Sequence, residues 1–492
     1  MAELKVIRGG AQTVLRFEPG QRLSDVLNAQ GMNVLRPCGG RGVCGKCAVL
    51  PSGQISPPSP AERKAGVRLA CQTVLLGDSE VILPESRPME QIELGSRGAL
   101  TPIAPMPGRY GAAVDIGTTT VALSLYDLRT GRCLAESGML NPQSAAAADV
   151  MGRIGAALAG EGNRLKDQVT NAVSALLSQA CAQADVDEAL VESMVVTGNT
   201  TMLYLLTGHS PAPLSHAPFE ADWLFDETVT LCGRQAYLPP CMHAFVGADI
   251  TCAVLSCGMC DEEGIALLCD VGTNGELALW KDGQLLVTST AAGPAFEGAG
   301  ISCGCGSVAG AVDRVWVRDG QAAVHTIGEA PAVGVCGSGL IDAVAAGLAL
   351  GEIDETGAME KDFWPLTEGV RLLPGDIRAV QLAKAAIAAG LETLLESAKI
   401  TVPQLDAFYI AGGFGSHLNA QSAAAIGLFP QDAVKKARVV GNGALAGAAQ
   451  LLLDQGKMDR ARQIARSARH VNLGGNPCFN QHYMEQMLFP EA

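Results

Sequence analysis

The sequence predicts two unlike parts, a small α+β domain of the β-grasp class and a larger α/β body with two lobes. Four cysteines with a distinctive spacing lie within the first 71 residues. A strand–Asp-x-Gly-Thr–strand pattern then occurs twice, with its acidic residues at Asp115 and Asp270. Between the small domain and the larger body, residues 86–109 hold four prolines and show little periodicity, which is typical of a linker.

Composition limits the classes of function that this chain can have. Its 492 residues are enough for about three domains of ~150 residues. A hydrophobic content of 48%, with 58 glycines and 4% aromatic residues, favours an α/β protein. The formal charge of −15 argues against nucleic acid as a partner. No run of 18 apolar residues occurs, so we expect no membrane partner. Sixteen cysteines without a signal peptide favour a cytoplasmic location.

The first cysteine group predicts an iron–sulfur cluster. Cys38, Cys44 and Cys47 share a short glycine-rich loop, and 23 residues separate Cys47 from Cys71. Three close thiolates and a distant fourth form the ligand pattern of a [2Fe–2S] ferredoxin. Glycine gives such a loop positive φ angles and leaves backbone N–H groups open to the sulfurs. The five-residue first gap resembles the adrenodoxin variant of that fold.

Two alternatives for these cysteines are a zinc site and a disulfide knot. Zinc sites with four cysteines more often show two C-x-x-C pairs, whereas only Cys44 and Cys47 have that spacing here. Disulfide knots are typical of small secreted domains. The cluster is therefore the favoured interpretation.

The predicted elements of the first domain follow ferredoxin order. Residues 3–8 and 12–17 are expected to form paired strands, and Ser24 is expected to cap a short helix that ends at residue 28. The cluster loop follows that helix, and we place the ferredoxin-like domain at residues 1–85. Residues 86–109 would then be the linker.

The larger body contains a duplicated hairpin. Strands at 112–116 and 121–126 flank the first Asp-x-Gly-Thr turn, and strands at 265–271 and 276–280 flank the second. A further strand at 408–411 runs into the Gly412-Gly413-Phe414-Gly415 turn. Alanine-rich helices are predicted between these strands, at residues 163–184, 338–350, 376–398 and 443–455.

These turns have the groups that a polyphosphate requires. The Asp carboxylate can hold Mg²⁺, the glycine allows the phosphate to approach the backbone, and the hydroxyl and N–H groups can bond phosphate oxygens. One such turn alone could be only a tight hairpin. Two in tandem, followed by the Gly-Gly-x-Gly turn, favour a nucleotide clamp.

The body, residues 110–470, resembles the acetate kinase/sugar kinase/heat-shock chaperone/actin superfamily of ATPases. Residues 115–120 match its first phosphate loop, 270–274 its second, and 412–415 its adenosine loop. Residues 195–201 and 441–449 resemble its two connecting segments. The resemblance implies ribonuclease H-like (actin-like) subdomains at about 110–246 and 247–470, with residues 471–492 as a tail packed on them.

A ferredoxin domain joined to this ATPase resembles a narrower family, the reductive activators of corrinoid proteins. Residues 247–250, 293–298, 336–340 and 476–480 also resemble that family. The resemblance implies an enzyme that takes an electron from a low-potential donor and uses ATP to return a Co(II) corrinoid to Co(I). Its partners would be that donor and the corrinoid protein of a methyltransferase, and it leaves a homodimer open.

The resemblance also implies roles for individual residues. Asp115 and Asp270 would hold the metal or position water, and Asn199 would orient the attacking water. Ser302 is the candidate corrinoid-facing residue. The expected contacts to Mg²⁺·ATP are Gly117, Thr118, Thr119, Gly272, Thr273, Asn274, Gly412 and Gly413.

Other interpretations stay open at this point. Cys252, Cys257 and Cys260 imitate a second cluster loop, but they fall in an apolar helical stretch, and with Cys303 and Cys305 they are expected to be core cysteines. The alternative functions are a small-molecule kinase with a ferredoxin regulatory domain, an activator of the 2-hydroxyacyl-CoA dehydratase type, and a redox-sensing scaffold.

Overall fold

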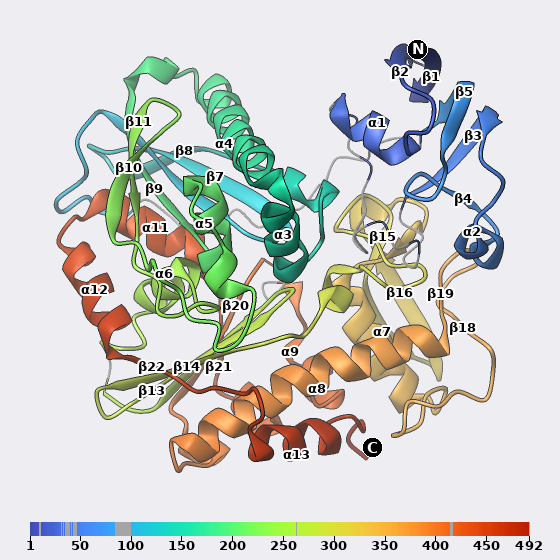
Figure 1. The fold of residues 1–492 in the computed structure, drawn as a ribbon. Helices are drawn as coiled ribbons and strands as arrows, with labels where there is room; N and C mark the ends of the chain where they lie inside the picture. The colour runs from blue at the N-terminus through green and yellow to red at the C-terminus, as the bar shows by residue number, and fades with distance from the viewer. Residues whose placement is uncertain are drawn as a thin grey trace. The chain divides into compact units, whose positions relative to one another are not determined.

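The computed structural model describes two compact units (Figure 1). One consists of Met1–Pro88 with Pro142–Gly160, and the other of Met89–Asn141 with Glu161–Ala492. The residues described are 1–8, 11–30, 32, 34, 40, 42, 47–83, 100–261, 263–413 and 417–491.

The first unit contains a five-stranded sheet in the order β2-β1-β5-β3-β4. β1 pairs antiparallel with β2 and parallel with β5, and α1 packs on the sheet through buried Leu23 and Leu27. This arrangement confirms the β-grasp prediction. Its elements are β1 (Ala2–Arg8), β2 (Ala11–Phe17), α1 (Leu23–Ala29), β3 (Ala48–Ile55), α2 (Pro60–Ala65), β4 (Arg68–Leu69), β5 (Leu75–Ile82) and α3 (Val150–Ala156).

The predicted cap of the first helix is wrong. Ser24 lies inside the first turn of α1 and is fully buried. The N–H groups at this helix start bond to a distant segment, Leu23 to the Thr73 carbonyl and Ser24 to the Ala70 carbonyl. Backbone groups close to Cys71 therefore do the work of a side-chain cap.

The second unit is built on two six-stranded sheets with matching connectivity. In the first sheet, β6, β7 and β8 form an antiparallel meander and β9 pairs parallel with β6. In the second, β12, β13 and β14 form the meander and β20 pairs parallel with β12. The duplication expected from the sequence is thus a duplication of sheets.

The five strands that the sequence predicted here, β6, β7, β12, β13 and β20, have bounds within two residues of the predicted ranges. The first sheet contains β6 (Tyr110–Ile116), β7 (Thr120–Asp127), β8 (Arg132–Leu140), β9 (Val191–Gly198), β10 (Glu227–Leu231) and β11 (Arg234–Leu238). The second contains β12 (Ala266–Val271), β13 (Gly275–Lys281), β14 (Gln284–Thr290), β20 (Ala407–Ala411), β21 (Ala437–Gly441) and β22 (Ala468–His470). A smaller sheet contains β15 (Ala311–Arg318), β16 (Gln321–Thr326) and β17 (Gly334–Val335).

The helices of this unit include the four that the alanine-rich stretches predict. Those four are α4 (Gly162–Ala184), α7 (Gly337–Ala349), α8 (Pro374–Ser397) and α11 (Gly443–Leu453). The others are α5 (Thr200–Thr207), α6 (Ala248–Cys257), α9 (Ala420–Ala425), α10 (Gln431–Val434), α12 (Lys457–Ser467) and α13 (Pro477–Glu485).

Helices α6 and α11 cross closely between the two sheets. A Cβ atom built on Gly447 of α11 would lie 2.1 Å from the carbonyl oxygen of Cys252 in α6, so only glycine fits there. The residues expected to form the first connecting segment, 195–201, belong instead to β9 and the start of α5. The structure corrects this expectation. The helix that α11 crosses is α6, which begins at Ala248, well after the segment 195–201.

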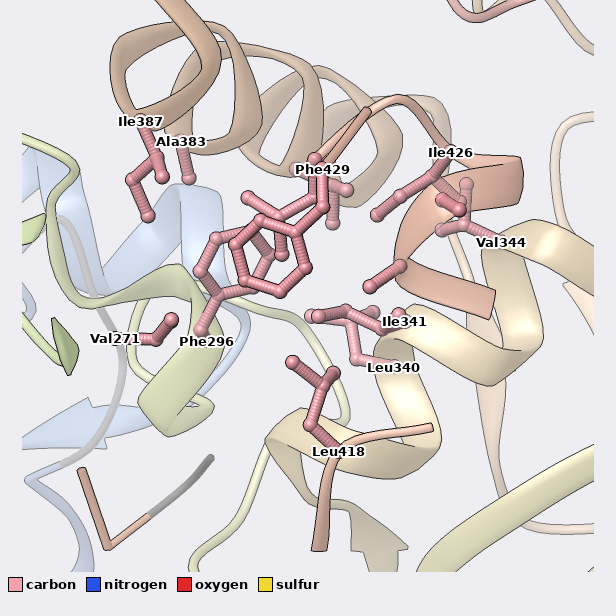
Figure 2. Packing of buried hydrophobic residues seen from close by; sticks show 14 of the residues in the cluster. Val271, Phe296, Leu340, Ile341, Val344, Ala383, Ile387, Leu418, Ile426 and Phe429 are labelled. Atoms are coloured by element: carbon pink, nitrogen blue, oxygen red, sulfur yellow. The ribbon is translucent and has the colours of Figure 1, made fainter. Parts of the chain in front are cut away.

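Both faces of the second sheet are buried. Leu267, Cys269 and Val271 of β12 point into one core with α7 and α8, whereas Leu268 points into another with α6 and α11. Figure 2 shows Val271, Phe296 and Ile387 entering the first core. The second Asp-x-Gly-Thr turn therefore starts from a strand that is packed on both sides.

Part of the predicted linker lies against the second unit. The N–H groups of Ile103 and Met106 bond to the carbonyls of Leu453 and Leu452 at the end of α11. Residues 84–99 lie outside the described residues, so the linker and domain boundaries stay a prediction. Within the described part, none of the helices has the length and apolar character needed to cross a membrane.

We predict that Gly447→Ala destabilises the second unit by about 1–3 kcal/mol, because the added methyl group meets backbone that can move only with α6. The midpoint of its denaturant or thermal transition should fall. The matched control is Gly375→Ala in α8, where a Cβ has open space and no positive φ is required. An unchanged midpoint for Gly447→Ala would show that the two helices separate easily.

Candidate functional site

Two hairpin turns form the floor of the site. The N–H of Gly117 bonds to the Thr120 carbonyl at 2.9 Å, and the N–H of Gly272 bonds to the Asn274 carbonyl at 3.0 Å. A Cβ on Gly117 would lie 2.9 Å from the Thr120 oxygen, so this turn closes only around a glycine. Both predicted phosphate loops are thus tight turns, although the first bond closes across three residues and the second across two.

The two turns meet through their threonines. The hydroxyl oxygens of Thr119 and Thr273 lie 3.5 Å apart. Both hydroxyls also donate to the same carboxylate oxygen, Oε2 of Glu297, with a distance of 2.8 Å from Thr273. Glu297 follows the core residue Phe296, which is 1% exposed and fixes the loop. Sequence reasoning included residues 293–298 as family-like but gave Glu297 no role.

Four carboxyl groups gather beside these turns. Burial raises the pKa of Asp115 to about 6, against a hydrogen bond from Asn442. Burial and then the charge of Asp115 raise the pKa of Asp270 to about 7. Burial and then repulsion by Asp115 and Asp270 raise the pKa of Asp249 to about 8. Burial and the charges of Asp249 and Asp270 raise the pKa of Glu276 in the same direction.

This cluster of four carboxyl groups has the character of a cation site. Asp115, Asp249 and Asp270 are only partly buried, so a ligand can reach them, while Glu276 is 8% exposed. Crowded carboxylates in a desolvated cleft repel one another, and a divalent cation with oxygen ligands removes that repulsion. The residues present therefore fit Mg²⁺. Sequence reasoning included residues 247–250 as family-like but gave Asp249 no role, and it gave Glu276 none either. These two residues come from α6 and β13.

Two asparagines cap helices that start at the site. Asn199 accepts from the Met202 N–H to cap α5, and its Nδ2 donates to Thr118 Oγ1 at 3.1 Å. Asn442 accepts from the Leu445 N–H to cap α11, and its Nδ2 donates to Asp115 Oδ2 at 3.0 Å. Each cap thus positions one residue of the first phosphate loop. An Asn directly before the helical stretch 443–455 was the signal for Asn442.

The start of the predicted adenosine loop packs on the second phosphate loop. Gly412 has φ +98°, and a Cβ there would lie 2.6 Å from Oδ1 of Asp270. Its N–H bonds to the Gly441 carbonyl at 3.1 Å. Gly413 is exposed. Residues 414–416 lie outside the described residues, and the nucleotide-contact roles of these glycines stay a prediction.

In the first unit, two predicted cluster ligands come together. The sulfur atoms of Cys47 and Cys71 lie 3.3 Å apart and both residues are buried, at 2% and 0% exposure. That separation is too long for a disulfide, at about 2.05 Å. It is near the spacing of two thiolates on one tetrahedral metal with bonds of about 2.3 Å. Cys38 and Cys44 lie outside the described residues.

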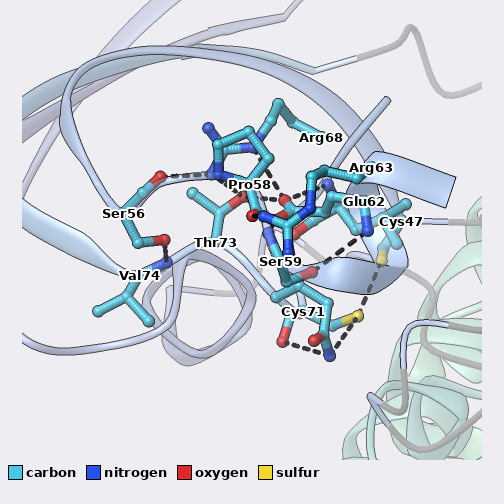
Figure 3. Close-up of polar contacts among 12 residues, drawn as sticks. Cys47, Ser56, Pro58, Ser59, Glu62, Arg63, Arg68, Cys71, Thr73 and Val74 are labelled. Atoms are coloured by element: carbon cyan, nitrogen blue, oxygen red, sulfur yellow. Dashed lines mark hydrogen bonds and ion pairs between the residues drawn. The ribbon is translucent and has the colours of Figure 1, made fainter. Parts of the chain in front are cut away.

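The chain segment that contains Cys71 is fastened by Glu62 (Figure 3). Glu62 Oε1 accepts from Arg68 Nε, the Leu69 N–H and Thr73 Oγ1, each at 2.9 Å. Its other oxygen accepts from the Ser59 N–H at 2.7 Å, which completes the capping box of α2. Burial raises the pKa of Glu62, but these hydrogen bonds outweigh burial and lower it to about 2.

The other predicted site residues have structural partners. Ser302 is exposed, and its N–H and hydroxyl both donate to Oδ1 of Asp376, at 2.7 and 3.0 Å, at the start of α8. Its corrinoid-facing role stays a prediction. Among the described residues, Cys252, Cys257 and Cys260 do not gather as metal ligands, nor do Cys303 and Cys305 with other ligand groups.

Comparison with known proteins accounts for most of the chain. Residues 7–76 match the 2Fe-2S iron–sulfur cluster binding domain, 110–262 the RACo middle region, and 264–492 the C-terminal ASKHA domain of RACo. The chain is 33% identical over 422 residues to the corrinoid activation enzyme RamQ of Eubacterium limosum, covering 77% of this chain and 70% of RamQ. The chain belongs to the reductive activators of corrinoid proteins.

Two further relatives agree with this family. The [Co(II) methylated amine-specific corrinoid protein] reductase of Methanosarcina barkeri is 27% identical over 423 residues, or 77% of each chain. A solved reductive activator for corrinoid, iron–sulfur protein superposes with a TM-score of 0.72 at 26% identity, covering 99% of this chain and 98% of the other. This member of the family therefore has a [2Fe–2S] ferredoxin domain and an actin-like, nucleotide-binding ATPase.

We predict that Glu62→Gln lowers the stability of the cluster-binding domain by about 1–3 kcal/mol at neutral pH. The reason is that buried donors around Cys71 lose the carboxylate that accepts from them. Heat-induced loss of the cluster absorbance should be faster. Since the folded pKa lies below the usual 4.5, this contribution is complete above about pH 4.5 and is lost as pH falls toward 2.

The matched control for this prediction is Glu18→Gln, an exposed carboxylate of the same unit. Equal rates of cluster loss in the Glu62→Gln and Glu18→Gln variants would contradict the role of Glu62.

Proposed function

We propose that this protein uses ATP to pass a low-potential electron from its [2Fe–2S] cluster to the Co(II) corrinoid of a methyltransferase partner, restoring Co(I). The observation that carries the proposal is the joining of two sites in one chain. Cys47 and Cys71 meet in a ferredoxin fold, and the Thr119 and Thr273 turns meet in an ATPase fold. The cluster supplies one-electron chemistry when bound.

In this proposal the cluster of carboxyl groups at the two turns holds Mg²⁺ together with ATP. Asp115 and Asp270, joined by Asp249, would bind the ion directly or through water. The hydroxyls of Thr118, Thr119 and Thr273 and the amide of Asn274 would donate to phosphate oxygens, next to Gly117 and Gly272. Gly412 and Gly413 would line the adenosine side. Asn199 would hold Thr118 in place and orient water, which is supported by its bond to Thr118.

ATP can drive the cycle only if it binds one conformation more tightly than another. Glu297 would provide such a preference, because its carboxylate accepts hydrogen bonds from both threonine hydroxyls. Phosphate oxygens would compete with Glu297 for the same two donors. The proposed switch is therefore an exchange of acceptors at Thr119 and Thr273 when nucleotide enters.

The remaining partners are proposed from the family alone. A separate low-potential protein would reduce the cluster, and a homodimer is open to a sedimentation measurement. We keep a cytoplasmic location as a prediction that rests on the cysteine content. The small-molecule kinase and the dehydratase-type activator lose support, because the family matches extend over the ferredoxin domain and the ATPase together.

We predict that Asp270→Asn lowers ATP hydrolysis about 100-fold or more, since a charged group at the proposed metal site is lost. Iron content and reduction of the cluster by a donor should be unchanged. The control is Asp282→Asn in the exposed β13–β14 turn, where Asn tolerates the positive φ equally well. Equal ATPase rates in the two variants would remove Asp270 from the mechanism.

The central test is anaerobic. Cluster-loaded protein, a low-potential reductant and a Co(II) corrinoid protein are mixed with and without Mg²⁺·ATP, and growth of the Co(I) absorption is followed. We expect faster and more complete growth with ATP, and a return to the ATP-free rate in Asp270→Asn. Identical growth with and without ATP, across several corrinoid proteins, would refute the proposed function.

A further inference from the structure

A cluster of metal-binding groups lies outside both sites, between the long helix α8 and the tail helix α13. Cys478 Sγ lies 2.8 Å from Oε2 of Glu396, and His482 Nε2 lies 3.0 Å from Oε1 of the same carboxylate. The ligand atoms of Glu396, Cys478 and His482 are all within 4.8 Å of one another. The C-terminal family match extends over these residues, but the proposed electron transfer gives them no role.

The sequence of the tail fixes this geometry. Cys478 and His482 are four residues apart in α13, so they lie on one face of that helix. Helix α13 runs beside α8 (Figure 1). Asn476 caps that helix by accepting from the N–H groups of Cys478 and Phe479, and Pro477 occupies the first turn. This cap therefore fixes the first turn of α13, which contains Cys478.

The three groups form a donor set that suits zinc. Thiolate, imidazole and carboxylate are the side chains that bind Zn²⁺, with bonds of about 2.0–2.3 Å in a tetrahedral arrangement. The Glu396 side chain is 58% exposed, which leaves a fourth position for water. This mixed set differs from an ordinary surface acidic cluster, because its thiol and imidazole come from one helix and its carboxylate from another.

A second carboxylate lies where zinc sites usually have one. Oε2 of Glu485 is 3.5 Å from Nδ1 of His482, on the opposite side of the ring from Glu396. A metal-binding histidine typically donates its other ring N–H to a carboxylate, which fixes the ring and its tautomer. Nε2 of His482 would then face the metal and Nδ1 would face Glu485.

We propose that Glu396, Cys478 and His482 bind a Zn²⁺ ion that fastens α13 to α8. The helix that is fastened also supports the nucleotide site, since Ile387 of α8 lies within 2.6 Å of where a Cβ on Gly275 would be. Asp376 at the other end of α8 holds Ser302. The ion would thus stabilise the tail against the helix beneath the second phosphate loop.

The test uses the full-length, cluster-loaded protein equilibrated with Zn²⁺ and freed of excess metal. We expect about one zinc per chain beside the cluster iron by elemental analysis. Cys478→Ser should lose the zinc and keep the iron, whereas Cys232→Ser, a half-buried cysteine elsewhere, should keep both. Wild-type protein without zinc, or Cys478→Ser with as much zinc as wild type, would overturn the proposal.

Two further measurements separate binding from a purely structural effect. Glu485→Gln should weaken zinc affinity about 10–100-fold while leaving the fold intact. Co²⁺ in place of zinc should give the visible absorption of a tetrahedral thiolate site, which Cys478→Ser removes and Cys232→Ser retains. Unchanged zinc affinity in Glu485→Gln, or a Co²⁺ spectrum that persists in Cys478→Ser, would contradict the site.

Discussion

The close crossing of α6 and α11 is the constraint on which the nucleotide site depends. Gly447 allows the two helices to approach to backbone contact, and each helix begins at the site. The first turn of α6 brings Asp249 close to Asp115 and Asp270, while the cap of α11 brings Asn442 to Asp115. A larger residue at the crossing would separate groups that must act together. The geometry of the candidate nucleotide site is therefore set by a helix crossing behind it.

The electrostatics of the site follow from this packing. Four carboxyl groups lie near one another away from solvent, and burial raises the pKa of Asp115, Asp249 and Asp270 into the range of about 6 to 8. A chain that only folded would have little use for such repulsion, because buried like charges are unfavourable. Functional sites are where perturbed pKa values gather. The cost of this arrangement suits a protein that binds a cation together with a polyphosphate.

Local patterns predicted local structure well. The Asp-x-Gly-Thr turns at Asp115 and Asp270 and the four alanine-rich helices were found at their expected places, because turn chemistry and periodicity are properties of short segments. The site residues that come from elsewhere were missed. Asp249 and Glu297 fall in stretches that resemble the family, and Glu276 begins a predicted strand, but nothing in the sequence shows that α6, β13 and the loop at residues 293–298 bring them to one place. The cap of α1 failed for the same reason: carbonyls near Cys71, and not Ser24, satisfy its first N–H groups.

The position of Glu297 between the two threonines has a consequence for how tightly nucleotide is held. In the proposed switch, a phosphate that binds Thr119 and Thr273 displaces a carboxylate that accepts from both hydroxyls. The apparent dissociation constant for nucleotide then includes the free-energy cost of that release. It equals the intrinsic dissociation constant divided by the fraction of molecules in which the Glu297 carboxylate has already left the two hydroxyls. Under this proposal, whatever separates Thr119 from Thr273 changes the affinity for ATP without touching the nucleotide.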